Sequence, residues 1–531
     1  MLSRFFSRRD LFQKGSLLAA PGFFRRLSAG TLKIGPAIFE SIGVRPLINC
    51  KGTYTIISGS QSLPEVKAAM EAASHHYVHL DELMEAAGKR LAELTQAEWG
   101  MVSNGCAAAL AHATAACIAG ADPEKMQRLP HAATLRNEVI APAYSRNVYD
   151  HAVRGVGARF VDVHTLDEYK RAFNDRTAMV MVLAGPGDRG ELGLQVLAPI
   201  AREHGVPVLV DAAAERLKIP NIHLAAGADL VAYSGGKCLR GPQAAGLLLG
   251  RKDLIKAAWL NSAPHHAFGR PMKACKEEIM GMLAAVEMWV KRDHDAEWKQ
   301  WESWLDTISK SVTRVSGVTT EVIQPGSLSN NSPQLRVTWD GEALGISGED
   351  AEKALLNGDP RIILGGSTGG RRNGAKNSSL TIMPYMMMPG DAAIAARRIH
   401  EVLAHPAASP LHKPSPPAVN LSGQWDVEME YVVGKAHHRL VFEQHEGELT
   451  GTHSGESLHG DLRGTVDGSE VWFRSSHQYE GTRIGYEFLG HAASDSITGE
   501  VNLGEYGTAG FTARRHQYGR PGGAVRPVKT V

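Results

Sequence analysis

Three separate segments of the sequence carry residue types that are needed for covalent chemistry on amines. Lys237 follows a glycine pair in the segment YSGGKCLRGP, and Asp211 ends the apolar segment VPVLVD. Ser103, Asn104 and Gly105 stand at the start of a run of small apolar residues that predicts a buried helix. A lysine amine forms Schiff bases, a carboxylate holds a proton on a ring nitrogen, and the free N–H groups of a helix start bind phosphate. Pyridoxal phosphate needs all three, so the segments together predict this cofactor.

Other interpretations of the lysine segment compete with this one. A nucleotide-binding P-loop requires glycine five residues before its Gly-Lys pair and Ser or Thr after the lysine, whereas this chain has Val231 and Cys238 at those positions. A lone Gly-Gly-Lys is otherwise most often a surface hairpin. The aspartate and the helix-start segment favour a cofactor-binding lysine over a hairpin lysine.

The elements that must position these residues alternate along the chain between residues 45 and 260. Helical periodicity and short β-branched apolar segments follow one another, with helices expected at 62–77, 80–96, 105–120 and 194–205 and strands at 100–103, 177–185, 206–211, 229–234 and 244–250. Such alternation predicts a mainly parallel sheet with crossover helices. Ligands bind at the carboxyl ends of the strands in such sheets, which is where the lysine and the aspartate fall.

Longer motifs then indicate a family. SNGCAAALAHATAACIAG, EHGVPVLVDAAAE and above all GADLVAYSGGKCLRGPQAAGLLLGRKDLI occur in this order within residues 48–402. These motifs resemble the selenocysteine-synthase-like branch of the fold-type-I pyridoxal-phosphate enzymes, and within it the ammonia-lyases that act on D-glucosaminate 6-phosphate. The resemblance implies an α/β fold with a parallel-rich sheet in a large cofactor-binding domain, followed by a small α+β domain.

The resemblance also implies roles for individual residues. Lys237 matches the family's Schiff-base lysine, Asp211 matches the partner of the pyridine nitrogen, and Ser234 matches a hydroxyl near the phosphate. Gly105 and Cys106 match positions of the phosphate loop, which Ser103 and Asn104 precede. Cys106 stands where relatives usually carry a small residue, but its backbone N–H stays available for the phosphate.

The implied reaction is an α,β-elimination. The lyase would remove ammonia from a β-hydroxy or polyhydroxy amino acid and leave a 2-keto acid, with Lys237 taking the α-proton. Transamination and racemisation begin with the same proton abstraction, so an aminotransferase or a racemase is an alternative. A protein that keeps the cofactor pocket but only binds a ligand is a second alternative.

Five further residues are candidates for contacts with cofactor or substrate. Tyr149 lies in a segment that resembles the family's cofactor-covering turn, so its ring is expected to stack on the pyridine. Arg270 and Lys273 match basic positions of the family and are expected to meet an anionic group of the substrate, unless they only flank the following helix. Arg361 is a candidate for binding the α-carboxylate of the substrate. His79, which lies just before the first long helix, is a further candidate for a substrate contact.

The chain divides into six parts by composition and periodicity. A twin-arginine-type leader, a cofactor-binding domain with its N-terminal segment, a small α+β domain, a proline-rich linker, an all-β domain and a tail are expected at residues 1–30, 31–295, 296–404, 405–419, 420–517 and 518–531. The all-β part alternates apolar and polar residues with turn signals about every ten residues, which predicts an antiparallel barrel or sandwich. It carries no acid pair or metal-ligand spacing, so we expect a module separable from catalysis.

Composition and the leader narrow the partners and the compartment. The net charge of +1 gives no general attraction to nucleic acid or lipid, so the expected partners are a small amino acid and further copies of the chain, as a homodimer or a larger homo-oligomer. The leader contains the segment SRRDLF before a weakly apolar run, which predicts twin-arginine export to the periplasm. No apolar stretch long enough to span a membrane follows it. Five cysteines without C-x-x-C spacing predict neither a disulfide framework nor a metal site.

Overall fold

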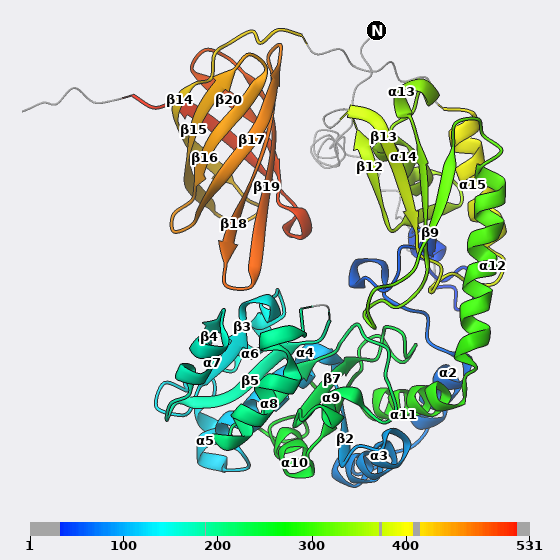
Figure 1. The fold of residues 1–531 in the computed structure, drawn as a ribbon, viewed down its shortest axis with the longest axis vertical. Coiled ribbons are helices and arrows are strands. Elements are labelled where there is room, and N and C mark those ends of the chain that lie inside the picture. Colours follow the sequence, from blue (N-terminus) through cyan, green and yellow to red (C-terminus); the bar gives the residue numbers. More distant parts are fainter. Residues whose placement is uncertain (1–31, 186, 371–373, 407–414, 518–531) are drawn as a thin grey trace, which may run out of the picture.

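The computed structural model describes residues 32–185, 187–370, 374–406 and 415–517. The expected leader at 1–30, most of the linker at 405–419 and the tail from residue 518 lie outside these ranges. Figure 1 shows three bodies, in which the small domain and a barrel both lie on one side of the large domain. Within the described ranges, no helix combines the length and the apolar character that spanning a bilayer requires.

A seven-stranded sheet forms the centre of the large domain. Its strand order is β2-β8-β7-β6-β5-β3-β4, and β8 runs antiparallel to both of its neighbours while the other pairs are parallel. The prediction of a parallel-rich sheet is therefore confirmed. The strands are β2 (Trp99–Ser103), β3 (Glu138–Pro142), β4 (Arg159–Val163), β5 (Thr177–Leu183), β6 (Val208–Asp211), β7 (Leu230–Ser234) and β8 (Gly246–Gly250).

The helices of the large domain cover this sheet, and α4 is the most deeply buried of the long ones. Almost every residue of α4 is buried, because its small side chains let the sheet and α10 pack closely on all sides. Two further helices, α2 and α3, pack on α11. The helices are α2 (Pro64–Ser74), α3 (Leu80–Thr95), α4 (Gly105–Ala119), α5 (Pro123–Arg128), α6 (Asp150–Gly155), α7 (Leu166–Ala172), α8 (Leu194–Glu203), α9 (Ile222–Ala225), α10 (Lys252–Leu260) and α11 (Lys276–Lys291).

The small domain begins with the long helix α12 and has two sheets. The first has the order β12-β13-β10-β9, and the second pairs β1 in parallel with β11. The elements are β1 (Leu47–Cys50), α12 (His294–Val312), β9 (Thr319–Ile323), β10 (Gln334–Trp339), α13 (Gly341–Leu344), α14 (Gly348–Asn357), β11 (Arg361–Leu364), β12 (Gly366–Gly370), β13 (Gly374–Ile382) and α15 (Asp391–Ala404).

The strand β1 lies with the small domain, whereas the sequence suggested that the whole segment from residue 31 belongs with the large one. Leu47 and Cys50 pair with Arg361 and Leu364, and Cys50 is fully buried in the core of the small domain. This parallel pairing joins residues more than 300 positions apart, which local periodicity cannot indicate.

The all-β part is a closed barrel of eight consecutive antiparallel strands. Alternate residues of each strand point inward and form one apolar core around the fully buried Trp425, as the alternating pattern predicts. The strands are β14 (Gly423–Glu430), β15 (Lys435–His445), β16 (Glu448–Ser454), β17 (His459–Asp467), β18 (Glu470–Tyr479), β19 (Thr482–Ala492), β20 (Ser496–Asn502) and β21 (Thr508–Arg515).

Candidate active site

The ends of β2, β7 and β6 bring the predicted residues to one edge of the sheet, with β8 lying between β2 and β7. Ser103 at the end of β2 and Ser234 at the end of β7 both lie opposite Gly246 at the start of β8, so the two serines stand in one row across the sheet. Asp211 at the end of β6 lies opposite Ala232, two residues before Ser234. The register of the sheet therefore gathers the carboxylate and the hydroxyls that the sequence selected.

Asp211 is a buried carboxylate beside two other predicted residues. Its side chain is only 2% exposed, and Oδ1 accepts a hydrogen bond of 3.0 Å from the Ala213 N–H. Burial raises the pKa of Asp211, while the Ala213 N–H and the positive charge of Lys237 act in the opposite direction. A cationic partner at this carboxylate would lower the cost of keeping it ionised, as a protonated pyridine nitrogen does.

The turn before α4 has the geometry of an anion-binding loop. Gly105 has a φ of +79°, and a Cβ built on it would meet open space rather than another atom. Gly246 lies directly below, because a Cβ there would collide with the backbone of Gly105 and Cys106. The Asn104 side chain does not cap the first turn of α4, so its N–H groups are offered to an anion at the positive end of the helix dipole. The Ser103 hydroxyl donates to the Gly105 carbonyl over 2.9 Å, which fixes the turn.

The glycine pair before Lys237 is required by close packing against protein atoms. A Cβ at Gly235 would lie 2.7 Å from the Met282 sulfur, and one at Gly236 would collide with the Gln243 side chain. The Gly235 N–H also donates to the Ala245 carbonyl over 2.8 Å. The tight loop brings the half-buried Lys237 to the wall of a cavity.

That cavity lies between the large and small domains and has a volume of about 500 Å³. Both domains contribute walls: Lys237 and Trp289 come from the large domain, and Tyr385 and Asn330 come from the small one. The Tyr385 hydroxyl lies 3.0 Å from the Thr53 hydroxyl and donates to Asn330 Oδ1 over 3.2 Å. These groups offer a hydrogen-bonding wall opposite the lysine.

Three arginines make the same cavity strongly cationic. Arg216, Arg240 and Arg292 line it together with Lys237, and Glu297 is the only carboxylate among its described lining residues. Arg292 lies 3.5 Å from Glu297, whereas Arg216 and Arg240 form no ion pair with any carboxylate in the described part of the chain. Burial, and then the charge of Arg292, lowers the pKa of Arg240. Guanidinium groups held without a carboxylate partner in a half-enclosed cavity favour an anionic ligand.

The cationic cluster has no signal in the sequence except the position of Arg240, three residues after Lys237. The guanidinium of Arg292, at the end of α11, donates to the Cys238 carbonyl over 3.0 Å. The guanidinium carbons of Arg216 and Arg292 lie 5.7 Å and 4.9 Å from the centroid of the Trp289 ring. Only the packing of α11 against the lysine loop brings these residues together.

Tyr149 stands at the start of α6, and the charges of Asp211 and Cys106 act on its phenol. Burial raises the pKa of Tyr149, and the next contributions come from the charges of Asp211 and Cys106. The phenol therefore lies within the electric field of the Asp211 carboxylate. The backbone N–H of Tyr149 donates to Asn147 Oδ1 over 2.8 Å, which fixes the backbone of Tyr149 on the preceding turn while its side chain stays exposed.

The remaining predicted residues occupy different places. Lys273 is exposed, and its carbonyl accepts a hydrogen bond of 2.9 Å from the Asn104 side chain, so it adjoins the α4 turn. Arg270 is exposed on the same loop. His79 is exposed before α3, with its ring 4.0 Å from the Asp81 carboxylate. Arg361 starts β11, where its guanidinium donates to the backbone carbonyls of Leu356 and Arg45.

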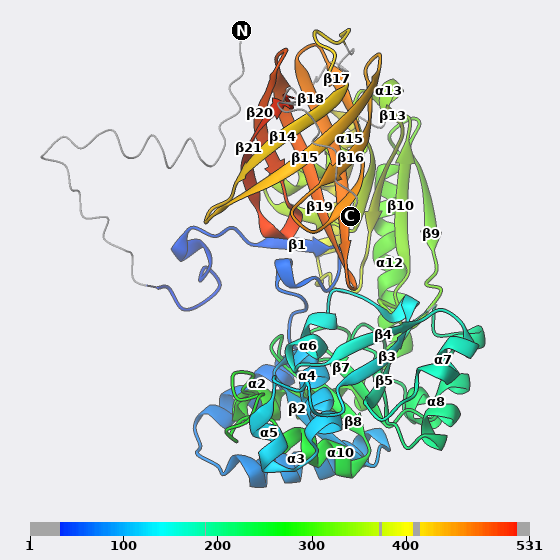
Figure 2. The same ribbon diagram turned by 90° about the vertical axis from the view of Figure 1, so that its left-hand side faces the viewer.

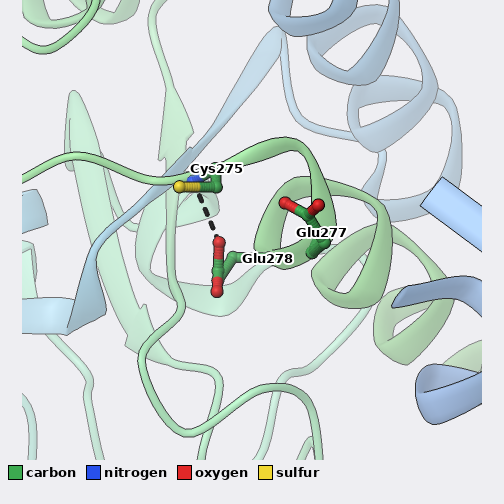
Figure 3. A group of neighbouring side chains, drawn as sticks. All are labelled: Cys275, Glu277 and Glu278. Carbon is green, nitrogen blue, oxygen red and sulfur yellow. Dashed lines mark hydrogen bonds between the residues drawn. The ribbon is translucent and has the colours of Figure 1, made fainter. Parts of the chain in front are cut away.

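One group of possible metal ligands occurs among the described residues, and its geometry is that of a helix cap. Cys275, Glu277 and Glu278 lie close together at the start of α11 (Figure 3). The Cys275 N–H donates to Glu278 Oε2 over 3.0 Å as part of a capping box, and Glu277 pairs with Lys276. The carboxylates are already engaged in holding the helix start.

Three observations test whether pyridoxal phosphate fits these residues. The α4 turn leaves open space above Gly105 for a phosphate, Asp211 is a buried carboxylate whose pKa burial raises and the Lys237 charge lowers, and Lys237 lines the cavity. The donor set therefore fits the group: N–H groups for its phosphate, a carboxylate for its ring nitrogen and an amine for its aldehyde.

Comparisons with known proteins agree with this fit. The aminotransferase class-V family model matches residues 153–276. The chain is 29% identical over 385 residues to 5'-C-glycyluridine monooxygenase-decarboxylase from Streptomyces sp, and the match covers 70% of this chain and 93% of that protein. It is 26% identical over 389 residues to D-glucosaminate-6-phosphate ammonia lyase from Salmonella typhimurium, covering 70% of this chain and 99% of the lyase.

A solved structure shows the same similarity in three dimensions. The structure of a D-glucosaminate-6-phosphate ammonia-lyase superposes with a TM-score of 0.62 at 26% identity, covering 70% of this chain and 99% of the lyase chain. L-seryl-tRNA(Sec) selenium transferase from Yersinia enterocolitica is 25% identical over 286 residues, or 48% of this chain and 58% of the transferase. The chain is thus a fold-type-I pyridoxal-phosphate enzyme with an aminotransferase class-V domain, homologous to D-glucosaminate-6-phosphate ammonia lyase and the selenocysteine synthases.

Proposed function

We propose that this enzyme is a lyase that removes ammonia from a β-hydroxy or polyhydroxy amino acid by α,β-elimination. The observation that carries the proposal is the cavity that Lys237 lines together with three arginines and with the hydroxyl and amide groups of Thr53, Tyr385 and Asn330. The similarity to an ammonia lyase over 99% of the length of that enzyme supports the same class of reaction.

The candidate cofactor residues and the cavity beside them would have defined tasks. When bound, pyridoxal phosphate supplies an electron sink that acidifies the α-hydrogen of a substrate amine. The N–H groups of the α4 turn would hold the phosphate, and Asp211 would keep the ring nitrogen protonated. Lys237 Nζ takes the proton from Cα, and the β-hydroxyl leaves as water. Hydrolysis of the resulting enamine takes up one water and releases ammonia, so the net products are a 2-keto acid and ammonium.

The walls of the cavity favour a substrate with one anionic end and hydroxyl groups along its chain. Arg216 and Arg240 are placed to bind a carboxylate, since guanidinium groups pair with carboxylates through two parallel hydrogen bonds. Tyr385, Thr53 and Asn330 offer both donors and acceptors to hydroxyl groups. The half-enclosed volume of about 500 Å³ suits a small molecule.

Other reactions of this cofactor are the alternatives. An aminotransferase or racemase would use the same lysine and aspartate. The relative with 29% identity carries the name of a monooxygenase-decarboxylase, which would release carbon dioxide and consume oxygen. A protein that only binds its ligand would show none of these products.

The test is an assay of the purified, cofactor-loaded enzyme with a panel of β-hydroxy and polyhydroxy amino acids of both configurations. Ammonia and a 2-keto acid should appear in equal amounts without oxygen uptake. Matched amino acids that lack the β-hydroxyl should release no ammonia, because no leaving group is present. Release of carbon dioxide, transfer of the amino group to an added 2-keto acid, or inversion at Cα without ammonia would contradict the proposal.

A further inference from the structure

The barrel contacts the large domain beside the candidate active site. The hairpin between β18 and β19 extends from the barrel toward α6, as Figures 1 and 2 show. Its turn consists of Glu480 and Gly481, between the paired residues Tyr479 and Thr482. The matched relatives are covered over 93% and 99% of their length by only 70% of this chain, so they contain no counterpart to the rest of it.

Two residues at the tip of this hairpin, Glu480 and Tyr479, each contact an arginine in or just before α6. Glu480 pairs with Arg146, whose side chain is 8% exposed and also pairs with Asp150 and Asp162. The Tyr479 ring faces the guanidinium of Arg154, 5.4 Å from its centroid. The charges of Glu480, Arg146 and Arg154 and the ring of Tyr479 thus connect one end of the barrel with the large domain. The sequence instead predicts that the barrel is separable from catalysis.

Gly481 makes the closest approach. A Cβ on Gly481 would lie under 3.0 Å from the Asp150 carboxylate and from the backbone N and O of Asn147. Only glycine therefore lets the hairpin rest on this turn in the present position. Asn147 is the residue whose side chain accepts the Tyr149 N–H at 2.8 Å, so Gly481 touches the support of Tyr149 directly.

Electrostatics connects the same region with the cofactor residues. Glu505 in the barrel turn η6 (Gly504–Tyr506) contributes to the raised pKa of Tyr149, after burial and the charges of Asp211 and Cys106. The Asp150 charge in turn contributes to the raised pKa of Asp211. The charges of the Asp211 carboxylate and of the barrel residue Glu505 thus both act on the Tyr149 phenol.

We propose that the β18–β19 hairpin is a positioning element of the active site: Glu480 and Gly481 hold the Asn147 turn so that Tyr149 covers the bound cofactor. The inference rests on the pyridoxal-phosphate site described above and extends it to residues outside the fold-type-I domains. The barrel then contributes to cofactor binding, and its seating on α6 affects the affinity of a site that lies in another domain.

The chain contains a matched control for this hairpin. The β15–β16 turn has the same Glu-Gly pair, Glu446 and Gly447, and both glutamates have a φ of +51°. That turn lies at the opposite end of the barrel, because alternate hairpins of an up-and-down barrel face opposite ways. A Cβ at Gly447 would approach only the Val466 carbonyl, at 3.3 Å. Gly447→Ala and Glu446→Gln thus repeat the substitutions of Gly481→Ala and Glu480→Gln without touching α6.

The experiment measures the Kd for pyridoxal phosphate and the induced circular dichroism of the bound cofactor in the full-length protein. Gly481→Ala and Tyr149→Ala should each raise the Kd about three- to tenfold, the range expected when one aromatic contact is lost. Glu480→Gln should act in the same direction, and both control variants should stay within twofold of the wild type. Tyr149→Phe should restore most of the affinity, because it keeps the ring.

The double variant Tyr149→Ala with Gly481→Ala decides whether the hairpin acts through the tyrosine. The double variant should have the same Kd as whichever single variant binds the cofactor more weakly. Both changes remove the same contact, that of Tyr149 with the cofactor. Additive losses, or an unchanged Kd and dichroism in Gly481→Ala while Tyr149→Ala loses affinity, would overturn the inference. The outcome does not depend on the proposed lyase reaction, because the affinity for the cofactor is measured without substrate. A wild-type protein that binds no pyridoxal phosphate would contradict both the lyase proposal and the role of the hairpin.

Discussion

The Cys106 thiol lies 3.8 Å from Oδ1 of Asp211, so the first turn of α4 and the end of β6 meet at one point. The first turn of α4 carries the N–H groups, and β6 ends at the buried carboxylate, that pyridoxal phosphate requires. Burial, and then the Asp211 charge, raises the pKa of Cys106, which keeps it a neutral thiol. The charge at this point of the site is therefore that of Asp211.

Asp211→Asn should lower turnover on the order of 10²- to 10³-fold, the usual cost of losing one group that stabilises developing charge. The amide cannot keep the ring nitrogen protonated, while its shape preserves the packing. Glu138→Gln is the control, because Glu138 is a buried carboxylate at the start of β3 that pairs with Arg159 and Arg176. It should lower thermal stability but leave turnover of the cofactor-loaded enzyme near that of the wild type. Equal turnover losses in both variants would mean that Asp211 acts only through stability.

Arg240→Gln should raise KM for the active substrate about tenfold or more with little change in kcat, since a hydrogen bond to a charged group contributes about 1.5–3 kcal/mol. The expected cause is the loss of a guanidinium that has no carboxylate partner in the described cavity. Arg251→Gln is the matched control, because Arg251 pairs with Asp229 and Asp253 outside the cavity. An unchanged KM in Arg240→Gln would exclude this residue from substrate binding.

The barrel should lose stability as the pH falls below about 6.5. Burial, with the charges of His477 and His438, lowers the pKa of His453 from 6.5 to about 2. Between these two values the unfolded chain binds more protons than the folded one, so the free energy of unfolding decreases as the pH falls. One such histidine contributes a loss of about 2 kcal/mol at pH 5.

Hydrogen exchange of peptides from β16 and β18, corrected for the intrinsic rate, measures this loss between pH 7 and pH 5. His453→Gln should flatten the pH dependence of the protection. His437→Gln should not, because His437, which precedes His438 on β15, is exposed. A barrel that keeps full protection at pH 5 would contradict the assignment of His453 as the destabilising group.

The two parts of the fold differ in how far the sequence predicted them. The strands that end at Asp211 and Ser234 are short apolar runs, and most barrel strands alternate between apolar and polar residues, so their local patterns were sufficient. The packing of the glycine pair was not indicated by the sequence: Gly235 and Gly236 lie close against Met282 and Gln243, so a side chain at either position would collide with them.

Long-range contacts account for what the sequence did not indicate. Arg216 and Arg292 come together only because α11 packs beside the lysine loop, and no period connects them. The contact of Gly481 with Asn147 joins two domains and depends on one missing Cβ. Arg361 was expected to bind a carboxylate, but a free guanidinium and one that holds backbone carbonyls look the same in a sequence.

We propose that residues 1–30 act as a twin-arginine export signal. Arg8→Lys combined with Arg9→Lys should leave the protein in the cytoplasm, because this export route requires the arginine pair. Fractionation of cells that express either form, with N-terminal sequencing of the periplasmic product, measures the effect. The mature wild type should begin near Gly30, and equal export of the double variant would contradict the proposal.

The most direct measurement is the identification of the residue that carries the cofactor. The full-length enzyme is incubated with pyridoxal phosphate, reduced with borohydride, digested and analysed by mass spectrometry. The account predicts one modified lysine, Lys237, in the loop that follows β7 at the wall of the interdomain cavity. Lys237→Ala should carry no reducible cofactor while keeping its fold. Modification of a different lysine, or stable reduction in the alanine variant, would contradict the assignment of this cavity as the active site.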